Sequence, residues 1–381
     1  MQDPSTCGDT SIAERRRLCA RSNTDASRMD FWIRARSSSR RATGTVCGLD
    51  LCGWWKPLAC SMLKPMDSPA SAPFSSHSSR VVPGWALSRN SAASEADAAF
   101  AAGSALNTLD SLVRSEPVWG GCWRMRLALK CAIAATRLAG RAEDEAGLRD
   151  AVLLVVPGDD PGPAGRIFLA HKKLTGRIRT VNANLLAELA DLLALKWNDP
   201  LAQAADYVEE ASQSGRAVPF AAADLVTAIC AERPDAEVLA WWLADWLVAE
   251  KLKWERPVPL LMGARHGSAF RVSGGKGRVH PGEEGFARAV CLALVDGVGD
   301  ALRHANEIGR RAERLLAAAP KVRTKGAERV IRMLLEDDAV SAAAPGANLS
   351  RWASRRLFER LETLGAVREL SGRSTFRIFG L

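Results

Sequence analysis

The sequence predicts a mainly α-helical fold, with a multi-helix domain over residues 95–320 and a small C-terminal module over residues 321–381. Three observations support this prediction. Apolar residues recur at helical spacing through most of the chain, a helix-and-hairpin pattern closes it, and the first 65 residues show neither a helical nor a strand period. With 381 residues, 47% of them hydrophobic, the chain can bury a sizeable core as one large or two smaller domains.

The N-terminal 65 residues differ in composition from the rest of the chain. They hold five of the nine cysteines and two arginine clusters, Arg15–Arg17 and Arg40–Arg41. No apolar segment typical of a secretory signal follows the early charges, and the cysteines lack the spacing and the nearby histidine of a zinc site. We therefore predict that residues 1–94 are disordered or a non-native extension, with Met66 as the true start and a lead-in rich in Ser, Pro and Ala after it.

Residues 95–320 indicate a series of amphipathic helices separated by breaks that contain proline or glycine. The predicted helices are Ala96–Ser115, Trp119–Ala139, Glu143–Val155, Ala164–Leu174, Ala183–Leu195, Leu201–Ser214, Ala221–Glu232, Glu237–Leu252 and Glu284–Ala319. Strand-like runs are scarce, and the best are Val258–Met262 and Phe270–Val272. No apolar run approaches the ~20 residues needed to cross a bilayer, so we expect a soluble cytoplasmic protein with no membrane partner.

The C-terminal module begins with a capped amphipathic helix. Ser350 is a good N-cap, and Gly365 suits the left-handed residue that ends a helix. Four apolar residues at helical spacing form one stripe: Ala353, Leu357, Leu361 and Leu364. Two alternating segments, Ala366–Leu370 and Thr375–Phe379, then predict a hairpin with Arg373 at its tip. A helix followed by such a hairpin is typical of a winged helix, although Val340–Asn348, where a further helix normally lies, predicts only a loop or one distorted turn.

The positive charge of the chain lies at its two ends. The net charge is +9, and residues 321–381 hold 12 basic against 7 acidic side chains. A basic surface favours phosphate through counterion release. We therefore predict contact with duplex DNA, with four residues at the groove and three on phosphates or in the minor groove. The groove residues are Arg351, Trp352, Ser354 and Arg355, and the others are Arg356, Arg360 and Arg373.

A second interpretation of the module remains open. Many winged helices dock proteins, and a basic helix face is often only solvated. That interpretation predicts an apolar patch around Trp352 and Phe358 and a protein partner or a homodimer.

One helix face carries candidate metal ligands. Asp296, Asp300, His304 and Glu307 are spaced by four, four and three residues, and carboxylate–imidazole ladders of this kind occur in metal-binding bundles. A complete site needs ligands from a second helix, and no other histidine lies on a matching helix. Asp300, His304 and Glu307 are therefore metal candidates against the alternative of a charged solvent face whose arginines pair at i,i+4 spacing.

The sequence contains no motif that indicates catalysis or a bound cofactor. Asp245 lies among three tryptophans, where burial would raise its pKa, but such a residue more commonly pairs with an arginine, caps a neighbouring helix or accepts an indole N–H. The acidic turn at residues 157–166 lacks the Lys-Ser/Thr ending of a phosphate loop. We therefore predict no catalytic residue and no cofactor.

Three segments resemble an uncharacterised bacterial, often plasmid-borne family, the domain of unknown function 1403. They are residues 159–166, residues 312–321, and the C-terminal residues 357–381. The resemblance covers about residues 73–381 and implies a cytoplasmic bacterial protein with no assigned activity. The C-terminal part is also similar to winged helices that end some Fic-type proteins, but the Fic catalytic motif is missing from this sequence.

These observations together predict a DNA-binding or DNA-associated accessory protein that acts through a C-terminal winged helix. The helical domain would dimerise, bind a partner or sense a ligand. The alternative is a helical interaction module whose winged helix docks a protein.

Overall fold

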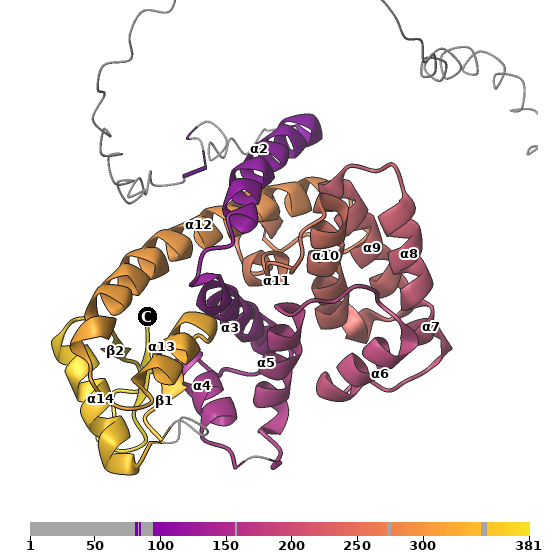
Figure 1. The fold of residues 1–381 in the computed structure, drawn as a ribbon. Coiled ribbons are helices and arrows are strands. Elements are labelled where there is room, and N and C mark those ends of the chain that lie inside the picture. Colours follow the sequence, from indigo (N-terminus) through magenta and orange to yellow (C-terminus); the bar gives the residue numbers. More distant parts are fainter. Residues whose placement is uncertain (1–80, 83, 85–93, 157, 273–275, 344–348) are drawn as a thin grey trace, which may run out of the picture. The chain divides into compact units, whose positions relative to one another are not determined.

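The computed structural model describes residues 81–82, 84, 94–156, 158–272, 276–343 and 349–381. These residues form a mainly helical protein with a small three-stranded sheet near the C-terminus (Figure 1). The predicted mainly α fold class is confirmed. The predictions for residues 1–94, including Met66 as the start, fall almost entirely outside the described residues.

The first helices agree closely with the predicted ones. They are α2 (Glu95–Arg114), α3 (Gly120–Leu138), α4 (Glu145–Leu153), α5 (Gly162–Leu174) and α6 (Ala183–Leu192). Polar caps fix several of their starts: the side chains of Ser94, Asp144 and Asn182 each accept a backbone N–H from the first turn of the helix that follows. The polar residues that break the sequence pattern are therefore the residues that begin the helices.

The middle of the chain forms the most apolar part of the core. Its helices are α7 (Asp199–Ala202), α8 (Ala204–Gln213), α9 (Val218–Glu232), α10 (Glu237–Leu252) and α11 (Leu261–Ala264). Helix α10 has its predicted bounds, whereas the single helix predicted over residues 201–214 is divided into α7 and α8. Trp241 and Trp242 of α10 are fully buried, and the Trp241 ring meets Phe270 edge-on at a centroid distance of 5.6 Å.

The predictions of two strands in this part of the chain are wrong. Val258–Met262 is a buried turn that runs into α11, because the Asp245 carboxylate accepts the backbone N–H groups of Leu260 and Leu261, each at 3.0 Å. Phe270–Val272 keeps only a single bridge, between Arg271 and Arg278, after a 3₁₀ turn. An apolar run is as compatible with a buried turn as with a strand when a distant side chain supplies its hydrogen bonds.

Helix α12 (Phe286–Ala318) precedes the C-terminal module in the chain and contributes to the core. It buries one face along its whole length and packs against α2, α9 and α11 (Figure 1). Gly297 permits a close approach to the loop before α11, since a Cβ there would lie 3.0 Å from the backbone oxygen of Leu260. Neither α12 nor any other described helix is long and apolar enough to cross a membrane.

The C-terminal module combines two helices with a short antiparallel sheet. Its elements are α13 (Ala327–Glu336), β1 (Val340–Ser341), α14 (Arg351–Thr363), β2 (Arg368–Glu369) and β3 (Ile378–Gly380), and the sheet order is β1-β3-β2. Both predicted hairpin strands are present in shortened form. Helix α13 is missing from the predicted helices, and β1 lies in the segment predicted as a loop or distorted turn, of which residues 344–348 are outside the described part.

A buried ion-pair network joins this module to the helical part. Asp338, between α13 and β1, accepts hydrogen bonds from Arg126 of α3 and from Arg149 of α4, the latter at 2.6 Å. Arg126 also donates to the backbone oxygen of Leu381 at 3.1 Å. All three charged side chains are at most 5% exposed. Within the module, Phe358 and Phe379 stack at 4.6 Å, so one continuous apolar core includes α14 and β3.

Two glycine substitutions test this packing. Gly380→Ala is expected to destabilise the protein by about 1–3 kcal/mol, because a Cβ would lie 2.6 Å from the Asp338 backbone oxygen and 2.8 Å from the Leu370 side chain. Gly103→Ala, on the exposed side of α2 with no atom within 4 Å of the added Cβ, should stabilise it by about 0.5–1 kcal/mol. Urea unfolding measures both, and equal effects of the two substitutions would contradict the close packing at Gly380.

Candidate functional site

The exposed face of α14 gathers most of the predicted DNA-contacting residues. Arg351, Trp352, Arg355, Arg356 and Arg360 are all exposed, as is a single acidic residue, Glu359. The Ser350 hydroxyl accepts the backbone N–H of Ala353 and begins the helix, as predicted. The face therefore carries four guanidinium groups against one carboxylate, with Arg355 paired to Glu359 at 2.8 Å.

Ser354 does not share this face, and its predicted orientation is wrong. Its side chain is 3% exposed, and its hydroxyl donates a hydrogen bond to the backbone oxygen of Ala342, beside β1. The buried stripe of α14 consists of Ser354, Leu357, Phe358 and Leu361. It is therefore turned by about one residue from the stripe predicted from apolar side chains alone, because a serine with a hydrogen-bond partner can occupy a buried position.

Arg373 is engaged elsewhere in the molecule. Its guanidinium forms two hydrogen bonds with the Asp150 carboxylate of α4, at 2.7 and 2.6 Å. Instead of projecting freely from the hairpin, this side chain fastens the β2–β3 connection to the helical part. Arg373 is therefore less accessible to phosphate than the exposed arginines of α14.

Two aromatic side chains of the module face solvent. Trp352 is 74% exposed and Phe376 is 72% exposed. Phe358, which the sequence places in a docking patch with Trp352, is instead fully buried against Phe379. Any apolar docking surface of the module therefore involves Trp352 and Phe376.

The predicted metal candidates on α12 pair mainly with arginines. Asp300 is paired with Arg303, and Glu307 with Arg311 at 3.0 Å. Among the residues that the structure describes, no group of three or more His, Cys, Asp or Glu side chains is placed to hold a metal ion. The geometry therefore favours the charged-face alternative for Asp300, His304 and Glu307.

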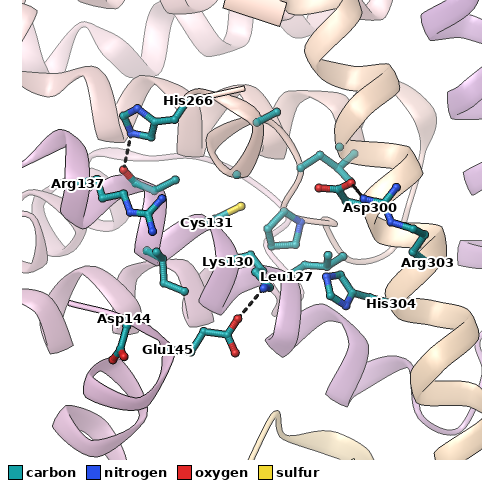
Figure 2. A pocket seen from close by; sticks show the side chains of 17 residues that line it. Leu127, Lys130, Cys131, Arg137, Asp144, Glu145, His266, Asp300, Arg303 and His304 are labelled. Atoms are coloured by element: carbon teal, nitrogen blue, oxygen red, sulfur yellow. Dashed lines mark hydrogen bonds and ion pairs between the residues drawn. The ribbon is translucent and has the colours of Figure 1, made fainter. Parts of the chain in front are cut away.

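Asp300 and His304 nevertheless border a pocket between α3, α4, α11 and α12, with a cavity volume of about 510 Å³ (Figure 2). Lys130 of α3 forms an ion pair with Glu145 of α4 at 2.5 Å on one side of it. His304 of α12 also lines the pocket. Burial lowers the pKa of His304, and the positive charge of Lys130 lowers it further. On the opposite wall, His266 Nε2 lies 3.0 Å from the backbone oxygen of Ala134.

The Cys131 thiol lines this pocket, and the buried Asp245 carboxylate accepts the backbone N–H of another lining residue, Leu260. Burial raises the pKa of Asp245 to about 7, against the lowering effect of the backbone N–H groups of Leu261 and Leu260. Burial also raises the pKa of the Cys131 thiol well above its usual value, and the Asp245 charge adds to this shift. The thiol is therefore protonated and a poor nucleophile. Asp245 caps α11, one of its predicted alternatives, whereas the indole N–H groups of Trp241, Trp242 and Trp246 are donated to other oxygens.

The family model of a protein of unknown function, DUF1403, matches residues 73–381, which include both the helical part and the C-terminal module. The chain belongs to the DUF1403 family. None of the curated proteins compared with the chain matches it.

In this DUF1403 protein, four charged residues that are not predicted to be buried lie in the interior, in addition to Asp245 and other buried polar groups. Arg124, Arg126, Arg149 and Asp338 are all less than 9% exposed. The signal present in the sequence is the position of Arg124 and Arg126 among the mostly apolar residues of the first half of α3. Buried arginines are usually paired, but the partners of Arg126 lie up to 255 residues away in the chain.

Proposed function

We propose that this protein binds duplex DNA through the exposed face of α14, as a DNA-associated accessory protein. The observation that carries the proposal is the cluster of Arg351, Arg355, Arg356 and Arg360 on one solvent face of a single helix, with Trp352 at its N-terminal end. Recognition helices contact base edges with their N-terminal residues and phosphates with neighbouring basic side chains.

The order of elements in the module supports the same proposal. A helix, a strand, a second helix and two further strands, with β3 between β1 and β2, resemble the order of elements in a winged helix. In a winged helix of this order, α14 would be the recognition helix and the β2–β3 connection would be the wing. Because Arg373 is fastened to Asp150, we assign the main phosphate interactions to α14.

Removal of arginines from α14 tests the proposal. Arg355→Ala and Arg356→Ala, singly and together, should weaken binding to duplex DNA and lower the slope of log K against log salt by about 0.9 for each phosphate that is no longer neutralised. Filter binding or fluorescence anisotropy over a salt series measures both quantities. Arg332→Ala is the matched control, because Arg332 on α13 is exposed and pairs with Glu328 as Arg355 pairs with Glu359.

The exposure of Trp352 and Phe376 favours a second candidate, in which the module docks a protein or a second copy of the chain. DNA affinity and salt slope that are unchanged by the double arginine substitution would overturn the DNA proposal. Loss of binding to a specific protein, or of self-association, in Trp352→Ala and Phe376→Ala would then support docking. The proposed setting is the bacterial cytoplasm, with the helical part dimerising, binding a partner or sensing a ligand.

A further inference from the structure

A second pocket lies at the N-terminal end of α3, away from the exposed face of α14. It has a cavity volume of about 550 Å³ and is bordered by the C-terminal ends of α5 and α13 and by the loop after α10. Its lining is mostly polar. Arg124 belongs to the lining, as do Arg177 and Arg256. The acidic groups of the lining are those of Glu116, Glu255, Glu336 and Asp337.

Arg124 is a buried cation that forms no ion pair with the residues that the structure describes, although its guanidinium lies 5.7 Å from the centre of the Trp123 ring. The side chain is 7% exposed. One of its terminal nitrogens donates a hydrogen bond to the Gly120 backbone oxygen at 3.3 Å, and its Nε has no hydrogen-bond partner in the described part of the chain. Burial lowers the pKa of Arg124 and the nearby Arg256 charge lowers it further, against the raising effect of the Glu116 and Glu255 charges.

Comparison with two other buried arginines shows that a buried arginine without an ion pair is unusual in this protein. Arg126 and Arg149 are equally buried, and both are neutralised by Asp338. An unpaired buried charge is far more costly than a paired one, and each unmade hydrogen bond of a buried donor adds to the cost. Arg124 also borders a cavity, so an anion in that cavity would form the direct ion pair that no described residue forms with it.

The start of α3 adds a second attraction for an anion. The helix has 19 residues and begins at Gly120 without a side-chain cap. The N–H groups of a first helical turn have no intrahelical acceptor and form the positive end of the helix dipole. Gly120 and Gly121 are both in the pocket lining. The Gly120 N–H already donates to the Pro117 backbone oxygen at 2.7 Å, which leaves the Gly121 N–H of this turn for a ligand.

We infer that this pocket binds the oxyanion of a small ligand, a phosphate or carboxylate group, between Arg124, Arg256 and the first turn of α3. Arg124 supplies the buried charge and Arg256 supplies an exposed charge at the entrance. Arg177 is paired with Glu255 and contributes less.

The acidic residues of the pocket restrict which other chemical groups the ligand can have. Glu116 and Glu336 are exposed at the pocket, and no described residue forms an ion pair with either. They would repel an extended polyanion such as duplex DNA, and they can accept hydrogen bonds from hydroxyl or ammonium groups. The ligand is therefore a small molecule with one anionic group, and the site is independent of the DNA proposal for α14.

The full-length protein can be titrated with inorganic phosphate and, separately, with acetate, at constant ionic strength. The Arg Nε–H signals in nitrogen–proton NMR spectra report binding directly, and thermal unfolding reports it independently. At least one probe should bind saturably and shift the Nε–H signal of Arg124. This signal is assigned as the one that disappears in the Arg124→Lys variant. Saturation by phosphate alone or by acetate alone would assign the group, and each result supports the site.

Arg256→Gln, at an exposed position that leaves the fold intact, should raise the apparent Kd at least tenfold. Arg124→Met should abolish binding, and Arg329→Gln, an exposed arginine of α13 outside the pocket, should match the unchanged protein. If neither probe saturates, or if Arg256→Gln binds as tightly as Arg329→Gln, the inference is overturned even where Arg124→Met fails to fold.

Discussion

Replacing Asp338 by alanine is expected to destabilise the protein by about 3–5 kcal/mol. The substitution removes the one carboxylate that lies between Arg126 and Arg149. Arg126 then remains buried without an ion pair, and Arg149 keeps only its weaker contact with the partly exposed Glu145, at 3.2 Å. The cost is larger than that of removing a surface ion pair, because the remaining charges cannot reach water without moving α3 and α4. Urea unfolding monitored by circular dichroism measures the free energy of unfolding.

The neighbouring Asp337 provides the control. It pairs with Lys172 at 3.3 Å in a partly exposed position, so Asp337→Ala should cost at most about 1 kcal/mol. Similar destabilisation in the two variants would show that the Asp338 network is not a buried ion pair of the kind described.

The pH dependence of stability should follow from the same network. Burial raises the pKa of Asp338, but the charges and hydrogen bonds of Arg126 and Arg149 outweigh burial and hold this pKa below its usual value. The stabilisation is therefore present above the carboxylate pKa of the unfolded chain and is lost as the pH falls through the folded value. The Asp338→Ala variant should lose less stability than the unchanged protein on acidification.

Most of the helical fold could be predicted because its signals are local. Helix α10 has its predicted bounds, since Pro234 precedes it and a dense apolar pattern fills it. The strand prediction at Val258–Met262 failed because its decisive hydrogen-bond partner is Asp245, which lies 15 residues away from Leu260 and on another helix. Local propensity cannot show such a hydrogen bond.

In the candidate site, too, the features that depend on local sequence could be predicted and those that depend on tertiary packing could not. The arginines of α14 could be placed from their spacing, since they alternate with Leu357 and Leu361 on a helix with a clear N-cap. The burial of Ser354 and the pairing of Arg373 with Asp150 could not, because both depend on backbone or side chains brought close only by tertiary packing. The lack of an ion pair between Arg124 and any described residue is likewise a property of the folded interior.

Asp245→Asn should change how stability depends on pH. Burial raises the pKa of Asp245 from 3.8 to about 7. A carboxyl with a raised pKa contributes stability that is fully present below the unfolded pKa and is lost as the pH rises through the folded value. The unchanged protein should therefore lose on the order of 4 kcal/mol through this group over that range, at 1.36 kcal/mol for each pKa unit. The asparagine variant cannot titrate and escapes this loss.

Asparagine has its own fixed cost at this position. Its oxygen can accept one of the two N–H groups of Leu260 and Leu261, and its amide nitrogen faces the other, so a constant penalty of about 1–3 kcal/mol applies at every pH. The measurement is therefore the difference in free energy of unfolding between the two proteins from about pH 5 to pH 8, which should move in favour of the variant as the pH rises.

The exposed Asp191 on α6 serves as the control, and Asp191→Asn should leave the pH profile parallel to that of the unchanged protein. Parallel profiles for Asp245→Asn would contradict a raised pKa at Asp245. Because this carboxylate holds the start of α11, and Gly263 and Ala264 of α11 line the pocket of Figure 2, its titration near neutral pH would also alter one wall of that pocket.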